Sequence, residues 1–181
     1  MKITNVTLYP VGTRRETLSV SPHIIVTLAT DEGVTGIGEM SDLGHNPAMP
    51  DADHLEYVLG QRLVGVDPFD PGRIDPVVDG FSAPLGAGID TAIHDLRGKV
   101  LGVPVHDLYG GAYRDRYKVC YPIFRQRDTS ELDKNIERVG KVLKLGFDLI
   151  RVYVGGNLDA DEAFVKTLRE TYGDAVKVKS L

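Results

Sequence analysis

Several features are scarce in this sequence of 181 residues, and each scarcity excludes a class of protein. The single cysteine, Cys120, has no partner for an internal disulfide, so oxidative stabilisation is excluded. No apolar stretch approaches the roughly 20 residues of a membrane-spanning helix, and the N-terminus has no apolar signal-peptide core. No basic run occurs, and the net charge of -5 argues against a nucleic-acid surface. We therefore expect a cytoplasmic protein without nucleic-acid or membrane partners.

The composition that remains is typical of a globular protein. Hydrophobic residues make up 42% of the chain and charged residues 26%, which is enough to bury a core. The length allows one domain, or one domain and part of another.

The first 40 residues have the pattern of a three-stranded antiparallel meander. Strands are expected over residues 2–12, 23–30 and 34–40. The turn Asp31–Gly33 joins the last two, because glycine tolerates the positive φ that a tight hairpin needs. The polar segment Thr13–Ser21 is expected to be a loop, and so is Ser41–Pro50. Amphipathic helices follow over residues 53–63 and 87–101, with a short helix between them.

From residue 113 onward the pattern changes to strands that alternate with helices. The expected strands cover residues 117–124, 148–154 and 176–181, and the expected helices cover residues 130–145 and 159–172. Ser130 and Asp159 are the predicted N-caps of these helices. Short connections between strand and helix favour parallel strands joined by right-handed crossovers. We therefore place a domain boundary between residues 112 and 113.

Four segments carry a resemblance that spans nearly the whole chain. They are MKITNV at residues 1–6, DEGVTGIGE at 31–39, IDTAIHDLRGK at 89–99 and LGVPVHDLYGG at 101–111. In this order and spacing they make the chain similar to the mandelate racemase/muconate lactonizing enzymes of the enolase superfamily. That family usually has an aromatic residue, often tryptophan, where this chain has His94.

The resemblance implies a fold of two parts. Residues 1–112 would form the α+β capping domain, a three-stranded antiparallel meander with helices. Residues 113–181 would form the first three strands and two helices of a modified α/β TIM-type barrel. Three parallel strands cannot close a barrel of eight, so we expect the 181 residues to be a piece of a longer polypeptide.

The resemblance also implies a chemistry. In the family a divalent metal, usually Mg²⁺, binds the carboxylate of a small substrate and stabilises the enediolate that forms when a base removes the α-proton. The metal ligands end barrel strands, and the first is due after Leu181, so no metal ligand is assigned within the chain. A homo-oligomer is expected as well.

Arg151 and Tyr153 are the candidate catalytic residues. They stand where the family commonly has Lys-x-Lys at the end of the second barrel strand, and strand alternation places them on one face. Arginine stays protonated and is a poor base, whereas tyrosine can act as one if a neighbouring cation lowers its pKa. The alternative, with equal weight, is a core aromatic beside a structural ion-pair partner.

Arg14, Arg15 and His45 are the candidate substrate-binding residues. They lie in the two expected loops of the capping domain, and in the family such loops close over the substrate. The alternative is that they are merely solvated. Lys177 and Lys179 imitate the Lys-x-Lys motif, but they belong to the third strand and are expected to be solvated.

The residues and the resemblance leave four functions open. The leading one is dehydration of a sugar acid, followed by racemisation or epimerisation, and then by cycloisomerisation. The fourth belongs to another class: a non-catalytic fragment that serves only as a structural or subunit-contact module. An aspartate directly after Leu181, and acids that end two later strands, would favour the enzyme.

Overall fold

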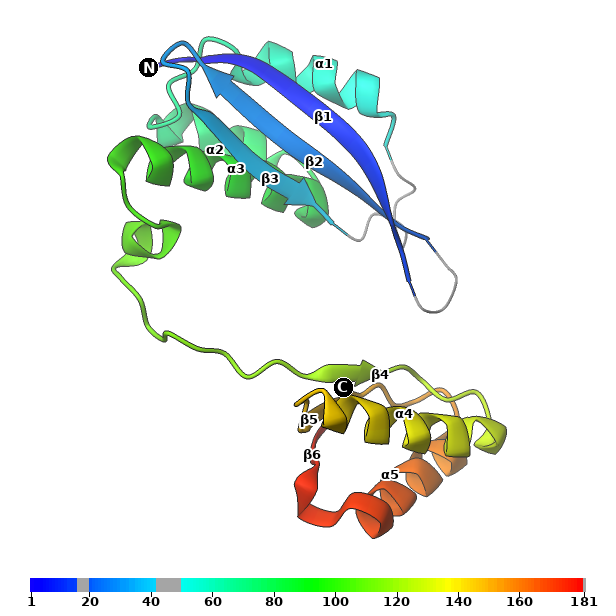
Figure 1. The fold of residues 1–181 in the computed structure, drawn as a ribbon. Helices are drawn as coiled ribbons and strands as arrows, with labels where there is room; N and C mark the ends of the chain where they lie inside the picture. Colours follow the sequence, from blue (N-terminus) through cyan, green and yellow to red (C-terminus); the bar gives the residue numbers. More distant parts are fainter. Residues whose placement is uncertain (16–19, 42–49, 181) are drawn as a thin grey trace. The chain divides into compact units, whose positions relative to one another are not determined.

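The chain forms two compact units in a computed structural model that describes residues 1–15, 20–41 and 50–180. The first unit is Met1–Tyr113 and the second is Arg114–Leu181 (Figure 1). Each unit has its own hydrophobic core and is described by itself. No helix in the described ranges is long and apolar enough to cross a membrane.

The first unit contains the predicted antiparallel meander. Its strands, in sheet order, are β1 (Ile3–Arg14), β2 (Val20–Thr30) and β3 (Thr35–Met40). Both neighbouring pairs are antiparallel, which confirms the prediction. The turn between β2 and β3 contains Gly33 at φ 76°, a conformation that glycine adopts without strain.

The first hairpin is longer than the sequence suggested. The segment Thr13–Ser21 was expected to be a loop, but Thr13 pairs with Ser21 and Arg14 pairs with Val20 in the ladder between β1 and β2. The expectation was wrong at these four positions, because a strand pair is closed by backbone N–H and C=O groups and does not require apolar side chains. Residues 16–19 lie outside the described ranges. Polar side chains are tolerated where a strand end is exposed.

Three helices cover one face of this sheet (Figure 1). They are α1 (Ala52–Leu63), α2 (Pro71–Asp79) and α3 (Ala83–Leu101), followed by a 3₁₀ turn, η1 (Val105–Tyr109). Helix α3 begins four residues before its expected start and has a proline in its first turn. It packs so closely on β3 that a Cβ built on Gly38 would lie 2.0 Å from the carbonyl oxygen of Gly88.

The second unit is a parallel sheet with helices. Its strands, in sheet order, are β4 (Tyr121–Ile123), β5 (Leu149–Val152) and β6 (Lys177–Ser180). Its helices are α4 (Leu132–Lys144) and α5 (Leu158–Tyr172), with short 3₁₀ turns η2 (Thr129–Glu131) and η3 (Gly173–Ala175). Both strand pairs are parallel, which confirms the predicted change of architecture. Strand β4 is shorter than expected.

The caps of both helices in this unit differ from the predicted ones. The side chain of Asp128 accepts from the backbone N–H of Ser130, and a 3₁₀ turn then leads into α4. The side chain of Asn157 accepts from the N–H of Ala160 and caps α5. The predicted cap Asp159 lies two residues after the observed cap of α5, whereas the predicted cap Ser130 lies in the 3₁₀ turn, one residue before Glu131, the N-cap residue of α4. Several polar residues precede each helix, so spacing alone does not identify the cap.

Candidate active site

Arg151 and Tyr153 lie on the face of the β4–β5–β6 sheet that the helices leave uncovered. Ile150 and Val152 alternate with them and are buried against Phe164 and other apolar residues of α4 and α5. Because successive side chains of a strand point to opposite faces, Arg151 points the other way. Tyr153 follows the strand and continues this alternation, because its N–H still donates to the oxygen of Ile123 on the neighbouring strand. The predicted division between an apolar face and a polar face is confirmed.

The structure brings Arg151 and Tyr153 into direct contact. The guanidinium carbon of Arg151 lies over the ring of Tyr153, 4.6 Å from its centroid. A cation in this position is attracted to the electron-rich face of the ring. The Nε atom of Arg151 is buried and has no hydrogen-bond partner among the described residues. The structure therefore brings the two candidate residues together, and their catalytic role stays a prediction.

Phe124 is a neighbour of Tyr153 that sequence reasoning missed. The two rings stack with centroids 5.4 Å apart and planes inclined by 13°. Phe124 directly follows β4, and the parallel register pairs Ile123 with Val152, so the next residue on each strand meets its counterpart. The register was the missing signal, because hydrophobic periodicity does not say which residues face each other across two strands.

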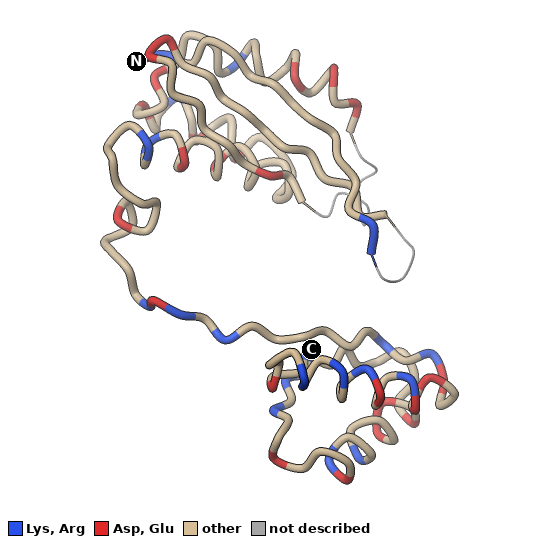
Figure 2. The backbone as a smooth tube through the Cα atoms, viewed as in Figure 1, with Lys and Arg blue, Asp and Glu red and all other residues tan. Residues whose placement is uncertain are grey.

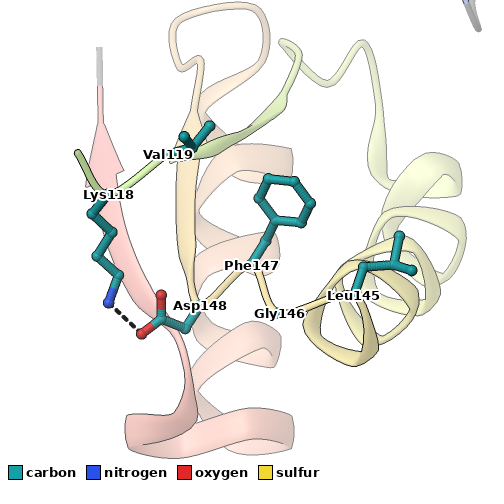
Figure 3. Close-up of a pocket in the computed structure, with 6 residues that line it drawn as sticks. All are labelled: Lys118, Val119, Leu145, Gly146, Phe147 and Asp148. Atoms are coloured by element: carbon teal, nitrogen blue, oxygen red, sulfur yellow. Dashed lines mark hydrogen bonds and ion pairs between the residues drawn. The ribbon is translucent and has the colours of Figure 1, made fainter. Parts of the chain in front are cut away.

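A cavity of about 180 Å³ in this unit is not lined by Tyr153. Figure 3 shows the residues that line it. Its lining residues come before β4 and β5 in the chain: Lys118, Val119, Leu145, Gly146, Phe147 and Asp148. Lys118 and Asp148 form an ion pair there, and the hydrogen bond from Lys118 holds the pKa of Asp148 below its ordinary value. Residues at the amino ends of parallel strands usually serve stability, so this cavity is not the candidate site.

A second cavity, of about 320 Å³, lies in the first unit. Its lining residues are Phe69, Pro71, His94, Arg97, Leu101 and Leu108. The ring of His94 stacks on Tyr109 at 5.0 Å, and Arg97 donates to the backbone oxygen of Pro68. His94 therefore stacks as an aromatic residue would. Partial burial raises the pKa of Tyr109. The contacts of His94, Tyr109 and Arg97 are therefore structural packing contacts.

The family can be identified by comparison with known proteins. The model described as "Mandelate racemase / muconate lactonizing enzyme, N-terminal domain" matches residues 1–110. This chain belongs to the mandelate racemase/muconate lactonizing enzyme family. The match confirms the resemblance to this enolase-superfamily family, and it makes the first unit the family's N-terminal capping domain.

Several relatives in the family are enzymes. A hydrophobic dipeptide epimerase of Enterococcus faecalis is 32% identical over 168 residues, which are 90% of this chain and 46% of the epimerase. A D-galactonate dehydratase of Pectobacterium atrosepticum is 31% identical over 199 residues, covering 98% of this chain and 47% of the dehydratase. The crystal structure of the dipeptide epimerase from Enterococcus faecalis has a TM-score of 0.80 at 29% identity and covers 99% of this chain and 52% of that one. The chain thus spans about half the length of the curated relatives it matches.

The predicted substrate-binding residues belong to the capping domain. Arg14 is exposed at the end of β1, and Arg15 donates to the hydroxyl oxygen of Ser21 at 2.6 Å. His45 lies outside the described residues. Arg151 and Tyr153 belong to the second unit, so a shared role of these arginines with Tyr153 stays a prediction.

A metal centre needs several His, Cys, Asp or Glu side chains close together. Within residues 1–15, 20–41 and 50–180, no group of three or more His, Cys, Asp or Glu side chains could hold a metal ion. The described residues therefore do not fit a magnesium site. Lys177 and Lys179 are exposed on β6, as predicted from the sequence, and the tube along this strand carries blue segments in Figure 2.

Proposed function

We propose that this chain is the N-terminal part of an enzyme that removes the proton α to the carboxylate of a small acid. The preferred reaction is dehydration of a sugar acid. The family membership supports the enzyme class, and a D-galactonate dehydratase among the relatives supports the substrate class. The complete enzyme in this proposal is a polypeptide that contains this chain and has the length of these relatives.

The observation that carries the proposal is the contact between Arg151 and Tyr153. Tyr153 follows β5 directly, and the carboxyl ends of parallel strands are where barrel enzymes place their catalytic groups. The guanidinium of Arg151 lies 4.6 Å from its ring centroid and places a positive charge beside the phenol. The phenolate oxygen of Tyr153 accepts the α-proton of the substrate, and the electron pair left behind forms an enediolate. The β-hydroxyl group then leaves as water with the proton that Tyr153 has taken, which restores the phenolate, and the resulting enol tautomerises to a 2-oxo acid.

The architecture in this proposal is a barrel that begins in the second unit. Strands β4, β5 and β6 would be its first three strands, with α4 and α5 on its outer side. The parallel pairing and the burial of Ile150 and Val152 against the helices support this assignment. The face that carries Arg151 and Tyr153 would then be the inner face.

Cofactor, location and assembly complete the proposal. Mg²⁺ is the expected metal of the complete enzyme, and it would polarise the substrate carboxylate when bound. Its ligands are expected after Leu181. A cytoplasmic location agrees with the single cysteine, Cys120. A homo-oligomer remains part of the proposal.

The experiment is an activity screen of the complete enzyme in D₂O. D-galactonate and other sugar acids are incubated with the enzyme and Mg²⁺, and the products are analysed by mass spectrometry. Dehydration predicts a product that has lost one water and contains a 2-oxo group. The absence of both water loss and α-deuterium incorporation from every acid in the panel would overturn the proposal and favour a structural module.

A second candidate is epimerisation, which the 32% identity to a hydrophobic dipeptide epimerase favours. The same Tyr153 would then remove the α-proton of a dipeptide. One deuterium would replace the α-proton, so the product would be heavier than the substrate by the mass difference between deuterium and hydrogen, and no water would be lost. A panel of dipeptides run beside the sugar acids therefore separates the two reactions in one experiment.

A further inference from the structure

Two buried polar side chains lie at the carboxyl end of the β4–β5 pair, beside the candidate site. Gln126, in the segment after β4, is 1% exposed, and Asp161, in the first turn of α5, is 5% exposed. Burying an amide or a carboxylate is costly unless its atoms are hydrogen-bonded. The burial of these two polar side chains therefore needs a structural or functional explanation.

Asp161 holds the turn that follows Tyr153. Its Oδ2 atom accepts a hydrogen bond of 2.8 Å from the backbone N–H of Gly155. Gly155 has φ 91° and is two residues after Tyr153, so the chain bends sharply there. A carboxylate that accepts from this N–H fixes the point at which the chain leaves the strand.

Gln126 joins the segment after β4 to the segment after β5. Its Nε2 atom donates to the backbone oxygen of Ala160 at 3.4 Å, next to Asp161. A Cβ built on Gly156 would lie 2.8 Å from the backbone oxygen of Gln126. The two segments are therefore in backbone contact, and a side chain at position 156 would push them apart.

The backbone between these contacts belongs to Tyr153 and its successors. The N–H of Tyr153 donates to the oxygen of Ile123 at 3.0 Å, and Nε of Arg125 donates to the oxygen of Val154 at 3.2 Å. Together with the bond from Gly155 to Asp161, three successive residues are each tied to a neighbouring segment. The position of Tyr153 is thus fixed from both sides.

The hydrogen bonding of the Gln126 and Asp161 side chains is incomplete. Oε1 of Gln126 and Oδ1 of Asp161 are buried and have no hydrogen-bond partner in the part of the chain that the structure describes. A partly satisfied buried network contributes less to stability than a well-packed apolar core. Such exceptions in natural proteins concentrate at functional sites. A contribution to stability therefore does not by itself explain why Gln126 and Asp161 are buried.

We infer that Asp161 and Gln126 are positioning residues for Tyr153. The inference rests on the proposed function, in which Tyr153 exchanges a proton with the substrate. Asp161 holds Gly155, Gln126 holds the two segments together, and the phenol oxygen is kept at one distance from the α-carbon. Proton transfer is sensitive to such placement, and a displacement of about 1 Å can cost 10²-fold in rate.

The first test compares substitutions of Asp161 in the complete enzyme, with the sugar acid that it dehydrates. Asp161→Ala leaves the Gly155 N–H without an acceptor, so kcat should fall roughly 10- to 100-fold while KM stays within about twofold. Asp161→Asn keeps an acceptor oxygen and should restore most of kcat. Asp159→Ala removes an exposed carboxylate from the same helical turn and should leave kcat unchanged.

The second test needs no turnover. Tyrosine labelled with ¹³C at Cζ gives one NMR signal per residue in the 181-residue chain, and the Tyr153→Phe variant identifies the signal of Tyr153. Asp161→Ala should shift or broaden this signal, and Asp159→Ala should leave it in place. If Asp161→Ala does not fold, Gln126→Met replaces it in both tests, with a kcat loss of roughly tenfold expected.

The outcomes separate the inference from the proposed function. If Tyr153→Phe retains full activity, the proposed function fails and the positioning role fails with it. If Tyr153→Phe is inactive while Asp161→Ala keeps wild-type kcat or an unchanged Tyr153 signal, only the positioning role is overturned. A failure of Asp161→Asn to restore kcat would also overturn it.

Discussion

Among single residues, Lys118 and Asp148 give the second unit a stability that depends on pH. The hydrogen bond from Lys118 lowers the pKa of Asp148 in the folded chain. A lowered carboxyl pKa contributes stability above the unfolded value of about 4, and this contribution is lost as the pH falls through the folded value. Both side chains are largely exposed, so the effect is small and sensitive to salt.

We predict that Asp148→Asn weakens the acid dependence of stability. Thermal unfolding midpoints measured between neutral pH and about pH 2 should fall less steeply below pH 4 in the variant than in the wild type. Asp174→Asn, an exposed carboxyl outside this ion pair, is the control and should keep the wild-type slope. The same acid slope in Asp148→Asn and in the wild type would contradict the assignment.

Only some residues of the candidate site could be predicted from the sequence. Arg151 and Tyr153 could be found because strand alternation and the family motif both point to them. Phe124, Gln126 and Asp161 could not be found, because their roles depend on parallel register and on loop-to-helix contacts. Buried polar residues in loops leave no periodic signal in a sequence.

Among the elements, the packing of α3 on β3 depends on glycine. A Cβ on Gly36 would lie 2.2 Å from the carbonyl oxygen of Ala92, and a Cβ on Gly38 would lie 2.0 Å from that of Gly88. These atoms are backbone and cannot rotate away. The Gly-Ile-Gly pattern in β3 therefore sets the distance between the sheet and the helix.

Gly38→Ala should consequently destabilise the capping domain by about 3 kcal/mol, the upper end of the usual cost of overpacking. The matched control is Gly60→Ala in the interior of α1, where a Cβ meets no atom within 4 Å. Alanine favours a helix over glycine, so the control should gain about 0.5–1 kcal/mol. Urea unfolding measures both changes, and a loss below about 1 kcal/mol in Gly38→Ala would refute the close packing.

Element boundaries were the least predictable part of the fold. The first hairpin continues through Thr13 and Arg14 because backbone pairing does not require apolar side chains. Strand β4 is shorter than predicted because Tyr117 and Val119, which suit a strand, are exposed and have no partner strand among the described residues. Strand order and direction were predictable, because connection lengths and hydrophobic periodicity determine them.

At the scale of the whole molecule, this chain spans about half the length of the curated relatives it matches. If the metal ligands of the complete enzyme follow Leu181, the 181-residue chain should bind no Mg²⁺ at micromolar affinity. Calorimetric titration of the chain measures this, with the complete enzyme as the positive control. Stoichiometric micromolar binding by the 181 residues would show that they contain ligands of their own.

The central claim is that Tyr153 exchanges the α-proton of the substrate, and Tyr153→Phe tests it most directly. Phenylalanine keeps the ring that stacks on Phe124 and contacts Arg151, and it removes only the hydroxyl. In the complete enzyme, kcat should fall by roughly 10²-fold or more, the usual scale for an acid/base group. Tyr117→Phe, at a tyrosine 72% exposed, should leave kcat unchanged. Near-wild-type kcat in Tyr153→Phe would contradict the account and make Tyr153 a structural aromatic residue.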